Sequence, residues 1–206
     1  NFSHILDYLF NNGYNFYLNY TINNYPKEIE TISNTPNQLI IDNLLELSKK
    51  WTIFWRYDPI YISKKTDFDF HINNFNFLCS LFKDRVDRVI VNFVQEYPKV
   101  IKKLQRAVGD YRYIPLSDKE IIAFAMEIRE IANKNNIKIT TCTDLLHKDN
   151  TIDKSSCVDK EIFERNCNTF LKIKESPTFK GCHCDKSVDI GFYHSCKNGC
   201  SYCYAM

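Results

Sequence analysis

The sequence has no long apolar run, no marked net charge and no secretory leader pattern. No stretch approaches the roughly 20 consecutive apolar residues that span a bilayer, and the first residues lack the basic and then apolar order of a signal peptide. The 27 basic and 25 acidic residues leave a formal net charge of +2. These absences argue against a membrane protein and against a nucleic-acid-binding surface, so we expect a cytoplasmic location.

The cysteines do not follow the layout of a disulfide-bonded secreted domain. There are nine, an odd number, and five of them lie in the last 25 residues. Small secreted domains instead use an even number, distributed over the fold. Cys79 and Cys167 stand in helical patterns beside apolar residues, where we expect them to pack in the core. The remaining cysteines are better explained as reduced thiols that ligate a metal than as disulfide partners.

Length and composition fit one folded domain over residues 1–206. Of the 206 residues, 44% are hydrophobic and 25% are charged, which is ordinary for a globular protein with a sizeable core. Position 1 is Asn rather than Met, and the last cysteine lies three positions before the end. We therefore expect a fragment that lacks the N-terminal part of its protein.

The apolar residues follow strand and helix spacings in alternation. Alternating or continuously apolar segments predict strands at residues 14–22, 51–57, 86–94 and 137–142. Helical spacing predicts helices at residues 35–50, 67–82, 98–106, 117–135 and 159–165. The strand at 86–94 is apolar on both faces, a pattern typical of a parallel sheet covered by helices on either side.

Four strand–helix repeats in succession predict an α/β fold with a parallel sheet, arranged as a TIM-like β/α barrel or part of one. These repeats occupy residues 1–175. From residue 176 to residue 206, cysteines and glycines replace the repeating pattern. We expect this metal-binding tail to pack on the mouth of the barrel and not to form a second domain.

Three cysteines near the carboxyl end have the spacing C-x3-C-x2-C, namely Cys196, Cys200 and Cys203. One turn can bring three such thiolates to a single centre, and Gly199 permits a tight turn. A 4Fe-4S cluster held by three cysteines has one iron without a protein ligand. That iron can chelate S-adenosylmethionine, whose reductive cleavage yields a carbon radical. Tyr202 would then neighbour the adenine, or alternatively it only packs against the barrel.

The other cysteines leave two alternatives open. A tetrahedral structural zinc site can be closed by Cys182 and Cys184 together with two thiols of the triad, Cys200 and Cys203. An auxiliary cluster can instead use the four thiols outside the triad, which are Cys142, Cys157, Cys182 and Cys184. Spacing alone does not establish that loop positions so far apart converge.

A charged pair stands at the predicted end of the second strand. Arg56 and Asp58 are two positions apart, hence on one face, at the barrel end where catalytic groups gather. Arg56 can grip a carboxylate or phosphate with two hydrogen bonds, while Asp58 orients it or binds a ribose hydroxyl. The alternative is an ion pair that only stiffens the end of the strand.

Several motifs together resemble the bacterial domain-of-unknown-function family DUF1848. They are Trp55-Arg-Tyr-Asp-Pro59, Cys182-His-Cys184, Ser187-Val-Asp-Ile-Gly191 and Cys196-Lys-Asn-Gly-Cys-Ser-Tyr-Cys-Tyr-Ala205. The resemblance covers most of the chain and implies carboxyl-terminal cysteines like those of radical S-adenosylmethionine enzymes. It also implies a further stretch ahead of residue 1. In ordinary radical enzymes the triad follows the first barrel strand, whereas here it stands last.

These observations favour an iron-sulfur protein of radical S-adenosylmethionine type that abstracts hydrogen from an unknown substrate. Such an enzyme would need an electron donor such as a flavodoxin or a ferredoxin. The rival hypothesis is a module without catalysis, in which the cysteines hold structural zinc or a fully ligated electron-transfer cluster.

Overall fold

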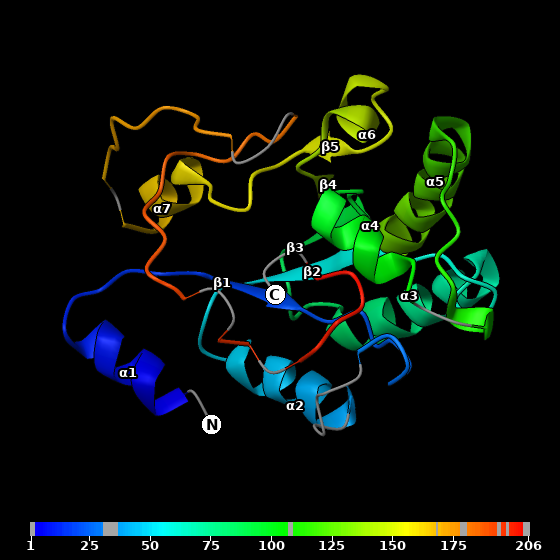
Figure 1. The fold of residues 1–206 in the computed structure, drawn as a ribbon. Helices are drawn as coiled ribbons and strands as arrows, with labels where there is room; N and C mark the ends of the chain where they lie inside the picture. Colours follow the sequence, from blue (N-terminus) through cyan, green and yellow to red (C-terminus); the bar gives the residue numbers. More distant parts are fainter. Residues whose placement is uncertain are drawn as a thin grey trace.

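A five-stranded sheet lies at the centre of the molecule in the computed structural model of the chain (Figure 1). The structure describes residues 3–30, 37–106, 109–167, 169–177, 181–192, 195–196 and 198–203. The strands are β1 (Leu18–Thr21), β2 (Ile53–Ile60), β3 (Arg88–Phe93), β4 (Lys138–Thr141) and β5 (Asp153–Lys154). They pair in sequence order, and every pairing is parallel. The predicted α/β fold with a parallel sheet is confirmed.

Helices precede, connect and follow the strands. They are α1 (Ser3–Asn11), α2 (Asn37–Leu47), α3 (Phe68–Phe82), α4 (Pro98–Leu104), the 3-10 turn η1 (Gly109–Tyr111), α5 (Asp118–Lys134), α6 (Asp144–Lys148) and α7 (Lys160–Cys167). The predicted capping box opens α5, because the Ser117 side chain accepts from the Glu120 N–H and the Glu120 carboxylate accepts from the Ser117 N–H. Among the described helices, none has the length and apolar character needed to cross a membrane.

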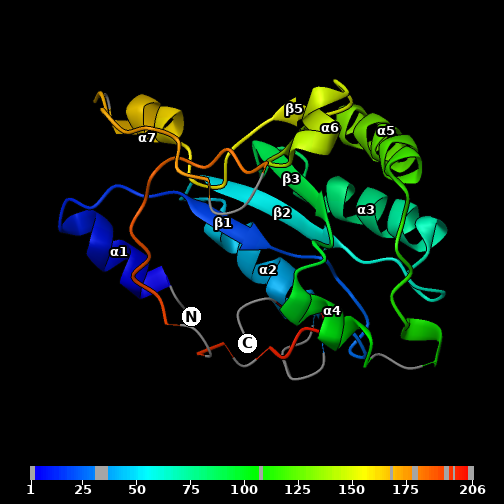
Figure 2. The ribbon, with the colours of Figure 1, turned by 45° about the horizontal axis from the view of Figure 1, so that its top comes forward.

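The helices α2, α3 and α5 cover one face of the sheet (Figure 2). A right-handed crossover between parallel strands placed in sequence order returns each helix to the same side. Trp55 and Tyr57 of β2 are fully buried against these helices, in a core shared with Val89 and Val91 of β3. Side chains alternate along a strand, so Arg56 lies on the opposite face. Loops, the tail and α7 lie over that second face, where the Tyr17 ring contacts both Phe54 of β2 and Phe163 of α7.

The sheet is open over the described part of the chain, so the predicted barrel is not confirmed. No pairing there joins β5 back to β1. The apolar pattern at 86–94 predicted helices on both faces of the sheet. In the structure α2, α3 and α5 cover one face, and loops, the tail and the short helix α7 cover the other. Burial under loops gives a strand the same apolar pattern as burial under helices.

The main differences from the predicted elements lie at short or polar segments. Strand β2 was expected to end at residue 57 but continues to Ile60 through Asp58 and Pro59, where its register with β3 shifts. A proline fits a parallel strand at such an irregularity because it has no N–H to donate. The structure adds α1, α6 and β5, which the sequence did not predict. The predicted start of α2 at residues 35 and 36 lies outside the described residues.

One buried histidine makes the stability of the core depend on pH. His71 is fully buried in α3, where its Nε2–H donates to the Tyr61 carbonyl at 3.1 Å and its Nδ1 accepts from the Tyr57 hydroxyl at 2.6 Å. A carbonyl can only accept, so this pairing fixes the neutral tautomer. Burial lowers the pKa of His71 from 6.5 to about 4.

We expect the free energy of unfolding to fall by roughly 3 kcal/mol between pH 7 and pH 4 because of this group. The unfolded chain takes up the His71 proton near pH 6.5 and the folded chain only near pH 4. Stability from His71 is therefore complete above pH 6.5 and is lost as pH falls through that window. Urea unfolding across this pH range checks it, with His71→Gln as the comparison. Equal pH slopes for the two proteins would contradict the assignment.

Candidate functional site

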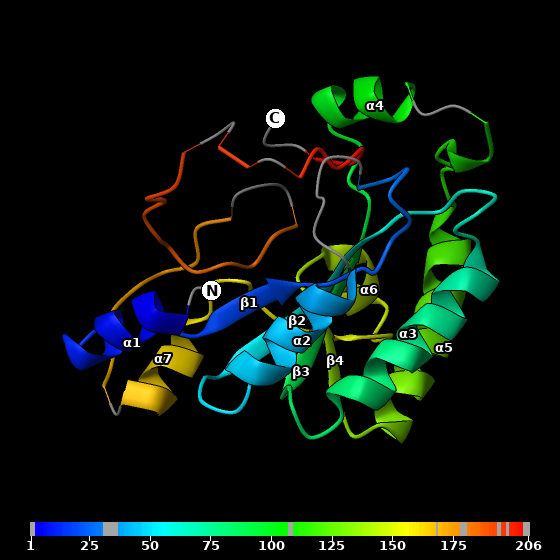
Figure 3. The ribbon, with the colours of Figure 1, turned by 90° about the horizontal axis from the view of Figure 1, so that it is seen from below.

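The carboxyl-terminal loop with the cysteine triad is attached to the carboxyl edge of the sheet. The Ser201 N–H donates to the Ile29 carbonyl at 2.9 Å, and Glu30 and Cys200 form an antiparallel bridge. From the other side, the Lys103 ammonium group donates to the Cys203 carbonyl at 2.9 Å. Figure 3 shows the red end of the tail beside α4, which carries this lysine. The loop thus lies between the segment that follows β1 and the helix that follows β3.

The three triad thiols differ in exposure. Cys196 is exposed, while Cys200 and Cys203 are half-buried. Gly199 adopts a left-handed conformation with φ of 58°. The turn itself lies at Ser201 and Tyr202, where the Cys203 N–H donates to the Cys200 carbonyl at 3.1 Å. Burial raises the pKa of the Cys200 thiol to about 11, with a further contribution from the Glu30 carboxylate. Within the described residues, no group of three or more His, Cys, Asp or Glu side chains is positioned around a common point as metal ligands are.

Tyr202 anchors the loop through both its hydroxyl and its ring. The hydroxyl donates to the Glu30 carboxylate and accepts from the Asn23 side-chain amide at 3.1 Å. The ring packs against Tyr25 and Tyr61, with centroid distances of 6.1 and 6.3 Å. Burial, followed by the Glu30 carboxylate, raises the pKa of Tyr202 far above its ordinary value. The predicted contact of Tyr202 with adenine stays a prediction. The contacts in the structure are those of the alternative, in which Tyr202 packs against the rest of the fold.

Removing the Tyr202 hydroxyl should loosen this attachment. We expect Tyr202→Phe to lower the free energy of unfolding by about 1–3 kcal/mol, because the Glu30 carboxylate loses its hydroxyl donor in a partly buried place. Urea unfolding measures the loss, and Tyr8→Phe serves as the control because Tyr8 is 66% exposed. Equal losses in the two variants would rule out the anchoring role.

Arg56 and Asp58 form an ion pair on the face of the sheet opposite α2, α3 and α5. A guanidinium nitrogen of Arg56 bonds one carboxylate oxygen of Asp58, and the Asn92 amide donates to the same oxygen at 3.2 Å. Burial by itself would lower the pKa of Arg56, but the charge and hydrogen bond of Asp58, together with Cys157 and Cys142, hold the pKa above its usual value. The Arg56 Nε–H is buried and has no hydrogen-bond partner within the described chain. Arg56 therefore keeps one donor unused.

Asn23 connects the cysteine loop to this ion pair. Its side-chain amide donates to the Asp58 carbonyl at 3.2 Å as well as to the Tyr202 hydroxyl, and its side-chain oxygen accepts from the Asp58 N–H at 2.8 Å. Sequence reasoning did not identify Asn23, Glu30 or Asn92. For Asn92 a signal was present, because it is a polar residue inside an otherwise apolar buried strand.

The four cysteines outside the triad that were proposed for a second site come together in the structure. Cys142 follows β4, Cys157 follows β5, and Cys182 and Cys184 belong to the tail. The Cys157 and Cys142 sulfurs lie 3.8 Å apart, and the Cys184 N–H donates to the Cys182 sulfur at 3.5 Å. The Cys157 and Cys184 thiols influence each other's pKa, which places them close together. Sequence spacing could not establish this convergence.

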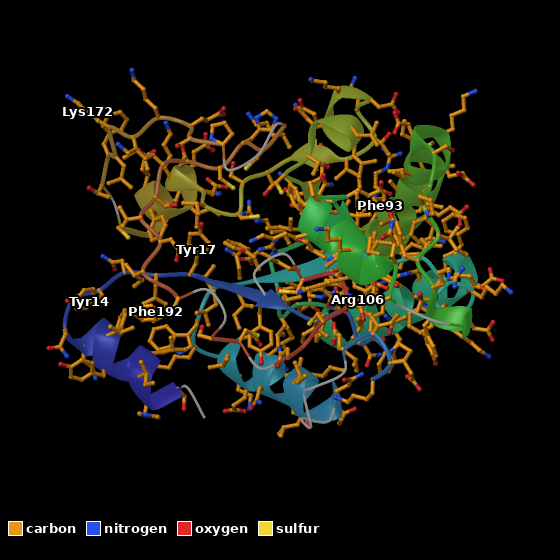
Figure 4. All side chains as sticks on the ribbon, in the orientation of Figure 1. Tyr14, Tyr17, Phe93, Arg106, Lys172 and Phe192 are labelled. Atoms are coloured by element: carbon orange, nitrogen blue, oxygen red, sulfur yellow. The ribbon has the colours of Figure 1, made fainter. Side chains whose placement is uncertain are left out.

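Tyr17 holds the Cys157 loop over the end of the sheet. Figure 4 labels Tyr17 between β1 and α7. Its hydroxyl donates to the Cys157 carbonyl and accepts from the Asp159 N–H, both at 2.9 Å, while its ring lies 4.9 Å from that of Phe163. Arg88 completes the attachment, pairing with Asp159 at 3.2 Å. The Asn19 amide of β1 also donates to the Cys157 carbonyl at 2.8 Å, so the loop is held by β1 and β3.

Two hollows open at opposite edges of the sheet. One, of about 510 Å³, lies at the amino edge between Trp51, Arg85 and Asn136 and has no cysteine in its lining. The other, of about 230 Å³, lies beyond the carboxyl ends of β3 and β4 and is lined by Gln95 and Asp144 among others. Parallel α/β enzymes bind their substrates at the carboxyl edge. The smaller hollow is therefore on the side of the candidate site.

Comparisons with known proteins identify a family and no characterised relative. The family model described as a domain of unknown function, DUF1848, matches residues 1–205. No curated protein and no solved structure matches the chain.

Proposed function

The chain belongs to the DUF1848 family, as its motifs predicted, and from that premise we propose that it is an iron-sulfur protein of radical S-adenosylmethionine type. In this proposal Cys196, Cys200 and Cys203 hold a 4Fe-4S cluster. The substrate is an unidentified molecule from which hydrogen is abstracted. The electron donor is a flavodoxin or a ferredoxin.

One observation carries the proposal: the triad is last in the sequence but lies beside the segment that follows β1. Ile29 and Glu30 of that segment bond Ser201, Tyr202 and the Cys200 backbone. Ordinary radical enzymes carry their three cysteines in a loop that follows a parallel strand at this edge of the sheet. The tail therefore supplies thiols at a comparable edge of the sheet, although it reaches that edge from the other end of the chain.

The donor set fits such a cluster. Three thiols lie within eight consecutive residues, in a loop whose Gly199 has a left-handed conformation. Soft thiolates favour iron-sulfur centres, and the Lys103 ammonium group beside Cys203 supplies positive charge near an anionic centre. When bound, the cluster supplies a coordination site for S-adenosylmethionine and the electron that cleaves its sulfonium bond.

The chain's own polar residues can bind a reactant at the same edge. Arg56, with its unpaired Nε–H, is suited to a carboxylate or a phosphate, and Asp58 holds it in place. Asn23 fixes the position of this pair relative to the cysteine loop by bonding both Asp58 and Tyr202. Tyr202 and its aromatic neighbours exclude water from one side of the loop.

Anaerobic purification of the chain tests the proposal. We expect a brown, reducible protein with about four irons that releases 5′-deoxyadenosine from S-adenosylmethionine in the presence of a strong reductant. A colourless protein with zinc at Cys200 and Cys203 would replace the proposal with the structural rival. A brown protein that never cleaves the cofactor would indicate a fully ligated electron-transfer cluster.

A further inference from the structure

Four buried or half-buried thiols from three separate segments meet beyond the carboxyl ends of β4 and β5. Cys142, Cys182 and Cys184 are between 4% and 7% exposed, and Cys157 is half-buried. The Cys142 and Cys157 sulfurs are in contact, the Cys157 and Cys184 thiols influence each other's pKa, and the Cys184 N–H bonds the Cys182 sulfur. In Figure 1 the orange part of the tail reaches β5, whereas the red part with the triad lies beside α4. The tail therefore contributes Cys182 and Cys184 to this group from one part and carries the triad on another.

One pair of sulfurs in the group has the spacing expected around a single tetrahedral ion. With Zn–S bonds of about 2.3 Å, two ligands of a tetrahedral site lie about 3.8 Å apart. The sulfurs of Cys142 and Cys157 lie 3.8 Å apart. An iron-sulfur cube holds its cysteine sulfurs much further apart, because iron and sulfide ions lie between them. A mononuclear centre fits this group better than the auxiliary cluster predicted from the sequence.

We propose that Cys142, Cys157, Cys182 and Cys184 together bind one Zn²⁺ ion, in a structural site separate from the triad. The proposal does not depend on the chemistry at the triad. The four thiols form a chain of contacts and not yet a shell around one point. Binding therefore includes rotation of the cysteine side chains within the same cluster.

The backbone around the four thiols is already fixed on both sides of the site. The Asp185 N–H donates to the Val158 carbonyl at 3.0 Å, and the Asp185 carboxylate accepts from the Lys160 N–H at 2.8 Å. The Ser156 hydroxyl donates to the His183 carbonyl at 2.5 Å. These bonds tie the Cys182–Cys184 segment to the Cys157 loop without using any thiol. Zinc would therefore join two segments that these hydrogen bonds already hold side by side.

Close packing ahead of Cys182 gives a second sign of a built site. Gly181 has φ of 86°, and a Cβ at this position would meet the Asp144 side chain at 3.3 Å. His183, between the two tail cysteines, bonds Asp144 through Nε2 at 2.8 Å and so turns away from ligation toward the start of α6. Arg56 interacts electrostatically with Cys142 and Cys157. Its charge would offset part of the negative charge of four thiolates around a divalent ion.

Cobalt titration of a chain without the triad tests this site alone. In the parent variant Cys196, Cys200 and Cys203 are all replaced by Ser, and Co²⁺ is added to the reduced protein under nitrogen. We expect one equivalent of Co²⁺ to bind with the strong visible bands of tetrahedral thiolate coordination, and Zn²⁺ to displace it. Because the triad is absent, a failed iron-sulfur proposal would leave this result unchanged.

Single replacements in the same parent identify the ligands. We expect Cys142→Ser and Cys184→Ser each to weaken Co²⁺ binding by at least about 100-fold, whereas Cys167→Ser binds like the parent because Cys167 lies at the end of α7, outside the group. Circular dichroism of each variant without metal confirms that it is folded. Absence of tetrahedral cobalt bands in the folded parent, or binding unaffected by both replacements, would overturn the proposal.

Discussion

Replacement of Cys200 by alanine is expected to remove the brown colour and all S-adenosylmethionine cleavage above background. Two thiols cannot hold a 4Fe-4S cluster that already lacks a fourth protein ligand. Alanine retains the backbone bridge between Cys200 and Glu30 and the adjoining Ser201 bond to Ile29, so the loop should keep its place. The loss would then come from ligation and not from unfolding.

Iron and sulfide content, the visible spectrum and 5′-deoxyadenosine release measure this effect in parallel. Cys167→Ala is the matched control, because Cys167 is also half-buried but lies at the end of α7. The control should retain both the cluster and the cleavage. A Cys200→Ala protein that still cleaves the cofactor would show that the cluster, if there is one, is held by other residues.

The sheet was predictable because its strands are local features of the sequence. Each of β1 to β4 carries its own apolar alternation or apolar run, and residues such as Ser117 and Asp67 mark the starts of helices by themselves. The two-residue strand β5 has no apolar pattern, since both of its residues are exposed. It forms because its backbone pairs with β4. A strand that depends only on its neighbour leaves no signal in its own residues.

The residues of the candidate site also differ in whether local sequence or the long-range fold brings them together. The triad is contained in eight residues, so spacing alone could suggest a common centre. The meeting of Cys142, Cys157 and Cys184 depends on how the loops after β4 and β5 fold back with the tail. Barrel closure is likewise a long-range property. Repeat length predicts parallel strands and helices but does not determine whether the sheet closes.

The role of Arg56 can be separated from that of its ion pair by a double replacement. We expect Arg56→Met to lower the free energy of unfolding by about 3 kcal/mol, because the Asp58 carboxylate, only 13% exposed, loses its counter-charge. Adding Asp58→Asn should recover most of that loss, since the remaining amide is neutral and its oxygen still accepts from Asn92. Urea unfolding of the two single variants and the double variant gives the coupling energy.

Cofactor cleavage in the stable double variant then decides between the two interpretations of Arg56. If Arg56 binds the carboxylate or phosphate of a reactant, the double variant should remain folded but need a much higher reactant concentration, because asparagine and methionine supply no cation. If the pair only stiffens the end of β2, cleavage should return together with stability. Full activity in the double variant would therefore assign Arg56 to the fold and remove it from the reactant site.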